Sequence, residues 1–177
     1  MVQRRVFVLA TVSALTGCGF QLRRPPELQL KRVFLAGFDA YSPMGDELRR
    51  QLRASRGVVL TETAAEADVV LDALEDAREQ VVAASTAAGQ VRELTLRARL
   101  RFKARTPAGR ELIAPAELTL TRDVSYSETT ALAKEQEIAL LFRSMHTDLA
   151  AQVLRRLAAP APPHQKAREA PSFRAGR

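Results

Sequence analysis

The sequence predicts an α+β fold, a two-layer sandwich in which a mostly antiparallel or mixed sheet of about four to five strands packs against two helices. Three observations support this prediction. Runs suited to strands outnumber the segments with helical periodicity, they cluster in the middle of the chain, and short glycine-containing turns join the longest of them.

The first strand is expected at residues 31–38, KRVFLAGF, a short apolar run suited to a buried position. A helix is expected at residues 41–57, because Ser42 is a suitable N-cap and Pro43 fits the first turn. Gly57 is expected to end this helix. Its apolar stripe repeats every four residues and consists of Met44, Leu48 and Leu52.

Three further strands are expected in the middle of the chain. A short strand, VVLTE at 58–62, is followed by a turn and by a longer strand over residues 68–86. The segments AAGQ at 87–90 and TPAG at 106–109 predict connections between antiparallel strands. The strand between these two connections is therefore expected to have antiparallel neighbours on both sides.

A long helix is expected to begin at Thr129 or Thr130 and to end before Pro160. Its period gives one apolar stripe, which is predicted to pack on the apolar face of the central strand. The stripe consists of Ile138, Leu141, Phe142, Met145, Leu149, Val153 and Leu157.

The segment LTLRARLRFKAR, residues 94–105, is the sharpest pattern in the folded part. Because side chains of a strand point alternately to opposite faces, one face is apolar and the other carries five cations. The apolar face consists of Leu94, Leu96, Ala98, Leu100, Phe102 and Ala104, and the cationic face of Arg97, Arg99, Arg101, Lys103 and Arg105.

Two interpretations of this cationic face stay open. The cations pair with acids of the adjacent strands, or they meet an anionic partner such as phosphate, which suits arginine side chains. Both can hold together. The acids expected beside the cations are Asp72, Asp76, Glu79, Glu117 and Asp123.

The first 17 residues are typical of a secretory leader, with Arg4 and Arg5 before a short apolar run. This run is shorter than the ~20 apolar residues that span a bilayer. The sequence Leu-Thr-Gly-Cys at 15–18 resembles a bacterial lipobox, in which the cysteine receives a diacylglycerol and becomes the first mature residue. Cys18 is the only cysteine. It is predicted to carry a diacylglycerol and a palmitate-type chain that anchor the protein to a membrane.

One domain is expected over residues 18–159, followed by a disordered, proline-rich, basic tail at 160–177. The net charge of +7 and pI near 10.4 would favour a nucleic-acid partner. However, the leader holds two basic residues, and the tail holds four with one acid. The domain itself has 21 basic and 19 acidic residues, so no nucleic-acid partner is expected.

No enzymatic activity, metal or cofactor is expected. The sequence has two histidines, His146 in the long helix and His164 in the tail, and has no glycine-rich phosphate loop or nucleophile elbow. His146 is interpreted as a partly buried packing residue. A membrane-tethered hydrolase, whose acids converge only in the fold, is kept as an alternative.

Two segments resemble LptE, a lipoprotein family of lipopolysaccharide assembly in Gram-negative bacteria. GCGFQLR at 17–23 resembles the start of the mature family members, and TALAKEQEIALLFRSMHTDLAAQVLRRLAA at 130–159 resembles their last helix. The AGQ turn and the amphipathic strand that follows it occur in the same order as in the family. The resemblance covers most of residues 15–159.

This resemblance implies an outer-membrane lipoprotein, lipid-anchored on the periplasmic side, that lies inside the LptD β-barrel translocon. It implies that the protein helps the barrel assemble and binds lipopolysaccharide during its delivery to the cell surface. A structural lipoprotein that fills the barrel without binding lipid is the alternative.

Few site residues follow from the resemblance. Lys134 matches a family lysine implicated in lipopolysaccharide contact, and at the start of a helix it lies beside free backbone N–H groups. The family's second basic position is Ala87 here. Arg92, just past the turn, is expected to reach the same region. Further candidate contacts are Arg97, Arg99 and Arg101. Without the resemblance, Lys134 would be interpreted as an exposed cation paired with Glu137.

Overall fold

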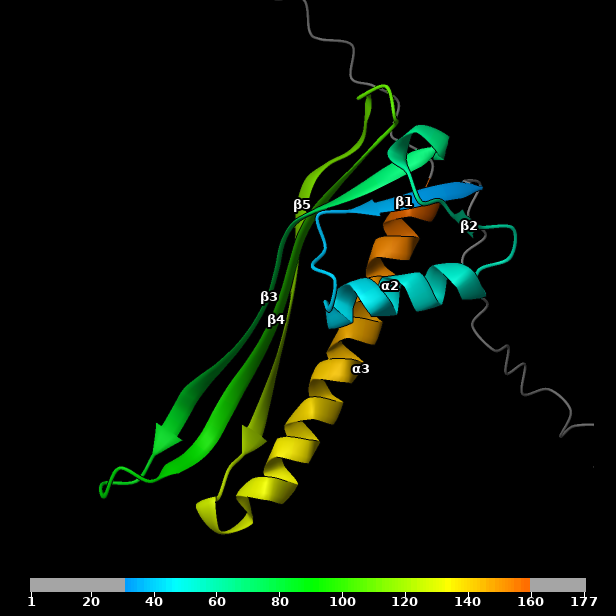
Figure 1. Cartoon of the computed structure of the whole chain (residues 1–177). Coiled ribbons are helices and arrows are strands. Elements are labelled where there is room, and N and C mark those ends of the chain that lie inside the picture. Colours follow the sequence, from blue (N-terminus) through cyan, green and yellow to red (C-terminus); the bar gives the residue numbers. More distant parts are fainter. Residues whose placement is uncertain (1–30, 160–177) are drawn as a thin grey trace, which may run out of the picture.

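The computed structural model describes residues 31–159, which form one mixed sheet with both α-helices on the same face (Figure 1). The strands are β1 (Arg32–Ala36), β2 (Val59–Leu60), β3 (Val69–Ser85), β4 (Val91–Arg105) and β5 (Glu111–Ser125). The helices are α2 (Pro43–Ala54) and α3 (Ala131–Ala158), with 3-10 turns η2 (Ala64–Glu66) and η3 (Glu128–Thr130). The predicted two-layer α+β sandwich is confirmed.

The strand order is β2-β1-β3-β4-β5. β1 is parallel to both β2 and β3, whereas β3, β4 and β5 form an antiparallel meander of long, curved strands (Figure 1). The pairing of β1 with β3 ends at Asp72, so most of β3 has only β4 as a neighbour. The sheet is therefore five-stranded at one end and three-stranded at the other.

Three sequence predictions concern residues outside the described part. They are the leader at 1–17, the lipid attachment at Cys18 and the tail at 160–177. Among residues 31–159, no helix combines the length and the apolar character needed to cross a membrane.

The start of α2 is as predicted. The Gly45 N–H donates to Ser42 Oγ at 2.8 Å, and Pro43 occupies the first turn, where a missing N–H costs nothing. The helix ends at Ala54, earlier than expected, because Ser55 is already extended. Gly57, with φ of 77°, then turns the chain toward β2.

The exit from β1 requires glycine. Gly37 has φ of 77°, and a Cβ at this position would lie 2.3 Å from the carbonyl oxygen of Ala73. A side chain is therefore excluded both by the backbone conformation and by the approach of β3. This tight passage leads the chain directly from β1 to α2.

The two hairpins of the meander use the same turn. In the first, the Thr86 N–H donates to the Gln90 carbonyl at 2.8 Å, and the Gly89 N–H donates to the Thr86 carbonyl at 2.9 Å. The second repeats both bonds at the same distances with Thr106, Gly109 and Arg110. In each, the threonine hydroxyl also accepts the N–H of the last residue at 3.1 Å. Both predicted connections are confirmed.

The core lies between the apolar face of β4 and the stripe of α3. Leu96, Leu100 and Phe102 are fully buried, and every predicted residue of the α3 stripe is buried except Leu141, which is half-buried. The helix also buries three residues outside that stripe: His146, Ala150 and Leu154. Leu154 packs with Val33 and Leu52, which joins α3 to β1 and α2.

Truncation of the α3 stripe is expected to be strongly destabilising. Leu149 is 1% exposed, so Leu149→Ala should lower the free energy of unfolding by about 2–5 kcal/mol through lost burial and the cavity left behind. Leu140→Ala on the same helix is the matched control, because Leu140 is 61% exposed and should change stability by less than about 0.5 kcal/mol. Chemical denaturation measures both, and equal losses would contradict the described packing.

Candidate functional site

The predicted cationic face of β4 lies on the side of the sheet opposite the helices, and its arginines pair with acids of β3. Arg99 Nη2 lies 2.7 Å from Glu75 Oε1 and 3.4 Å from Glu79 Oε1. Arg97 also reaches Glu79, at 3.5 Å, and Arg101 reaches Glu75 at 4.0 Å. Two glutamates thus bridge three arginines, which removes much of their mutual repulsion.

The end of this face nearest β1 has a second pair. Arg105 Nε donates to Asp72 Oδ2 at 2.8 Å. Asp72 is opposite Lys103 in register, but its carboxylate is turned to Arg105, and Lys103 forms no ion pair within residues 31–159. Arg99 keeps one buried nitrogen, Nε, without a hydrogen-bond partner.

The acids beside the cations are only partly those that the sequence predicted. β3 has a bulge, with a register shift between Ala73 and Glu75 that leaves Leu74 unpaired. The shift places Glu75 and Glu79 on the cationic face and moves Asp76 to the helix face, where Ser42 Oγ donates to it. The prediction that Asp76 neutralises the cations is therefore wrong, and Glu75 takes that role.

β5 contributes less than expected. Glu117 is opposite Arg101 in register, and Asp123 is opposite Thr95. Asp123 accepts a hydrogen bond from the Thr95 hydroxyl at 2.7 Å, and Glu117 accepts one from the Thr119 hydroxyl at 3.2 Å. Neither acid forms an ion pair with a β4 cation in the described residues, so the neutralising charge comes from β3.

The structure places Lys134 and Arg92 at the three-stranded end of the sheet. Lys134 Nζ donates to Glu137 Oε2 at 2.8 Å and to Ser125 Oγ at 3.3 Å. The next residue of the chain, Tyr126, donates its N–H to the Arg92 carbonyl at 2.8 Å. The Lys134 side chain and the Arg92 backbone thus lie beside the end of β5, and Lys134 already has a carboxylate partner.

Exposed apolar side chains lie at the same end. Leu132, in the first turn of α3, is 74% exposed, and Val82, opposite Leu94 in register, is 53% exposed. Val81 is 48% exposed. This end of the molecule therefore combines two cations with an apolar rim.

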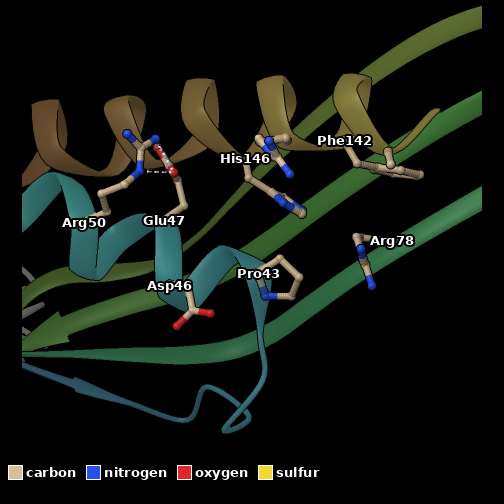
Figure 2. Close-up of a pocket in the computed structure, with 9 residues that line it drawn as sticks. Pro43, Asp46, Glu47, Arg50, Arg78, Phe142 and His146 are labelled. Atoms are coloured by element: carbon tan, nitrogen blue, oxygen red, sulfur yellow. Dashed lines mark hydrogen bonds and ion pairs between the residues drawn. The ribbon is translucent and has the colours of Figure 1, made fainter. Parts of the chain in front are cut away.

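A second candidate region is a cavity of about 630 Å³ between α2, α3 and β3 (Figure 2). In Figure 2, His146 projects from α3 toward β3, where Arg78 lies. The His146 ring stacks on Phe142 with ring centres 6.4 Å apart, and the Arg78 guanidinium lies 5.8 Å from the centre of the Phe142 ring. Sequence reasoning assigned no role to Arg78, because the bulge that turns it toward the helices has no sequence signature.

Two buried ionisable groups lie beside this cavity. Burial lowers the pKa of His146 below its ordinary value; the charge of Arg78 adds to this effect, and Asp76 and Glu47 oppose it. Burial by itself would raise the pKa of Glu47, but hydrogen bonds from Arg50 and Gln51 hold it below its ordinary value. The interpretation of His146 as a packing residue agrees with its 4% exposure.

Comparisons with known proteins agree with the fold. A family model for LptE, described as lipopolysaccharide-assembly, matches residues 30–157. A protein of Yersinia enterocolitica named LPS-assembly lipoprotein LptE is 30% identical over 145 residues, covering 80% of this chain and 68% of the relative. A protein of Yersinia pestis with the same name is 28% identical over 144 residues, covering the same shares.

Solved structures of bacterial lipoproteins are similar as well. The solution NMR structure of an uncharacterized lipoprotein B from Nitrosomonas europaea has a TM-score of 0.67 and 26% identity, covering 80% of this chain and 91% of that chain. The crystal structure of the rare lipoprotein B from Shewanella oneidensis has a TM-score of 0.60 and 28% identity, covering 72% and 93%.

The buried histidine gives stability a predictable dependence on pH. Because the pKa of His146 is lowered on folding, the unfolded chain binds more protons than the folded chain just below about pH 6.5, the ordinary value for histidine. Stability should therefore fall as the pH decreases through that window. His146→Gln removes this titration, so its melting temperature should fall less between pH 7.5 and pH 5.5 (roughly one unit either side of the ordinary histidine pKa). Identical pH dependence in the two proteins would show that His146 is not buried in its neutral form.

Proposed function

The chain belongs to the LptE family of lipopolysaccharide-assembly proteins, and from this premise we propose that it fills and helps assemble an LptD-type β-barrel translocon of the outer membrane and binds lipopolysaccharide during delivery to the cell surface. The observation that carries the proposal is the family match over residues 30–157, which covers every described strand and helix apart from the last residue of α3. The named relatives are both LPS-assembly lipoproteins.

The end of the sheet that holds Lys134 and Arg92 is the proposed lipid contact. Lipopolysaccharide carries phosphates close to its acyl chains, so a binding surface needs positive charge beside apolar side chains. Lys134 and Arg92 supply the charge, and Leu132 and Val82 supply exposed apolar surface next to them. Backbone N–H groups at the start of α3 add to the attraction for anions, because no acidic side chain occupies the first turn.

The cationic face of β4 is a weaker candidate for lipid contact. Arg97, Arg99 and Arg101 already share Glu75 and Glu79, so an anionic lipid has to compete with these carboxylates. This pairing also supports the alternative of a structural lipoprotein that fills the barrel and binds no lipid. The two functions differ in what happens to lipid affinity when the cations at the three-stranded end are removed.

Catalysis is not part of the proposal. The named relatives are assembly lipoproteins, and the residues described here include no group of three His, Cys, Asp or Glu side chains placed to hold a metal ion. Several acids of the described residues are engaged with arginines, as Glu75 and Asp72 are, or with a hydroxyl, as Asp123 is.

The protein is further proposed to be one domain, residues 18–159, anchored on the periplasmic side of the outer membrane through acylated Cys18, after removal of a leader at 1–17. The tail at 160–177 is proposed to lie outside that domain. One thioether-linked diacylglycerol and one amide-linked chain would provide the two or more chains that stable anchoring needs.

The double variant Lys134→Asp with Arg92→Asp should bind lipopolysaccharide at least tenfold more weakly. Charge-assisted contacts contribute roughly 1.5–3 kcal/mol each when shielded from water, and replacing them with acids adds repulsion. Displacement of labelled lipopolysaccharide measures binding, and circular dichroism checks that each variant is folded. Arg110→Asp is the control, because Arg110 is an exposed cation in the turn at the other end of β4 and should bind like wild type.

The outcome also separates the two candidate surfaces. If the folded double variant binds normally, the β4 face becomes the candidate lipid contact. The double variant Arg97→Asp with Arg101→Asp then tests that face. Normal binding by both double variants would leave only the structural role.

The lipid anchor gives an independent prediction. Intact-mass measurement of the mature protein should show a chain that begins at Cys18 and carries added acyl mass, and Cys18→Ala should remain unprocessed or soluble. The Cys18→Ala variant should keep part of its function, because burial inside a barrel involves far more surface than the anchor. The barrel partner is tested separately: purification of the wild-type protein in mild detergent should recover a large β-barrel protein with it. A mature chain without acyl mass would contradict the anchor.

A further inference from the structure

We propose that the cavity between α2, α3 and β3 is a second binding site, which takes a phosphate group between Arg78 and Arg143. The site lies on the helix face of the sheet, next to the start of α2, and so differs from the surface around Lys134 and Arg92. The proposal does not depend on the lipopolysaccharide contact.

The shape of the site follows from the topology of the sheet. β1 leaves the sheet at Ala36, opposite Asp72, and beyond this point β3 has no strand on that side. On the helix face of this part of β3, the cavity is bounded by α2 and α3 (Figure 2). Two smaller hollows, of about 490 and 430 Å³, adjoin the cavity and share Arg78 with it. The guanidinium of Arg78 is thus accessible from a continuous groove.

The acids that line the cavity have ion-pair partners, whereas two of its arginines have none within residues 31–159. Its two acids are both paired within α2: Asp46 with Arg49 at 2.8 Å, and Glu47 with Arg50 at 2.5 Å. Glu47 also accepts a hydrogen bond from Gln51 at 2.7 Å. In contrast, Arg78 and Arg143 form no ion pair within residues 31–159 and line the same cavity from β3 and α3.

Two unpaired arginines on facing elements suit a phosphate, since a planar guanidinium donates two parallel hydrogen bonds to its oxygens. Phe142 orients one of them, because the Arg78 guanidinium lies over its ring. His146 lies beside them at 4% exposure, where a nearby anion would favour its protonated form. A phosphate would therefore meet two permanent cations and one inducible cation.

Acids near the site limit which anion it accepts. Asp76, from β3, is engaged with the Ser42 hydroxyl, while Glu135 lines the adjoining hollow and forms no ion pair within the described residues. A ligand that extends past Phe142 would meet Glu135. The pocket therefore favours a compact phosphate over a polyanion, and Glu135→Gln should strengthen binding.

The test uses the full chain and NMR titration with inorganic phosphate. Signals of Arg78, Phe142, Arg143 and His146 should shift together and saturate, and the pKa of His146 should rise on binding. Arg78→Gln and Arg143→Gln should each weaken phosphate binding at least tenfold. Arg155→Gln is the matched control on α3. Arg155 is exposed and lies outside the cavity, so its substitution should leave phosphate binding unchanged.

A parallel titration identifies the source of the phosphate. Phosphatidylcholine vesicles with and without phosphatidic acid are added to the same protein. If the cavity signals shift with phosphatidic acid but not with inorganic phosphate, the ligand is a lipid headgroup. If they shift with inorganic phosphate but not with phosphatidic acid, the ligand is a free phosphate. Either result supports the site.

The proposal is overturned if neither probe shifts the cavity signals, or if the shifts occur at Lys134 and the β4 arginines instead. Because wild-type signals decide this point, the result does not depend on whether the arginine variants fold. Should Arg78→Gln unfold, Arg78→Lys keeps the charge and loses the two parallel hydrogen bonds, so it should fold and bind phosphate more weakly. Wild-type affinity in that variant would also overturn the assigned role.

Discussion

The burial of one face of β4 under α3 is the constraint on which the rest of the structure depends. Leu96, Leu100 and Phe102 have no exposed surface, so the register of β4 is fixed. Since a shift of one residue would exchange the two faces of the strand, it would place arginines in the core, at a cost of several kcal/mol for each unpaired charge. The five cations are thereby confined to the opposite face, and β3 has to supply acids there.

A single extra residue in β3 distributes the charges of that strand between the two faces. Before the bulge, Asp72, at an even-numbered position, points to the cationic face. After the bulge, Glu75 and Glu79, at odd-numbered positions, point to the same face. The same shift turns Asp76 and Arg78 toward the helices. Leu74 thus makes possible both the ion-pair network on one face and the charged cavity on the other.

The sequence predicts most of this fold because its apolar patterns are strong. The alternation in β4, the stripe of α3 and the two Gly-containing turns each correspond to an element at the expected place. The site is less predictable for a physical reason. Residues 75–80 of β3 carry polar side chains on both faces, so no apolar period reveals the bulge, and the face predicted for Asp76 is wrong. The burial of His146 follows from α2 crossing α3, a contact that sequence periodicity does not specify.

The described cations proposed as ligand contacts fall into two groups with different capacities for ligand binding. Arg97, Arg99 and Arg101 of β4 share the carboxylates of Glu75 and Glu79, so an anion that binds them gains little, because it replaces ion pairs of similar strength. Lys134 has one carboxylate partner, the exposed Glu137, one turn along α3, and Arg78 and Arg143 form no ion pair within the described residues. An anion at these positions replaces water or a single exposed carboxylate. Recognition should therefore occur at the margins of the sheet, where pairing is incomplete, while the central ladder chiefly maintains the shape that positions those margins.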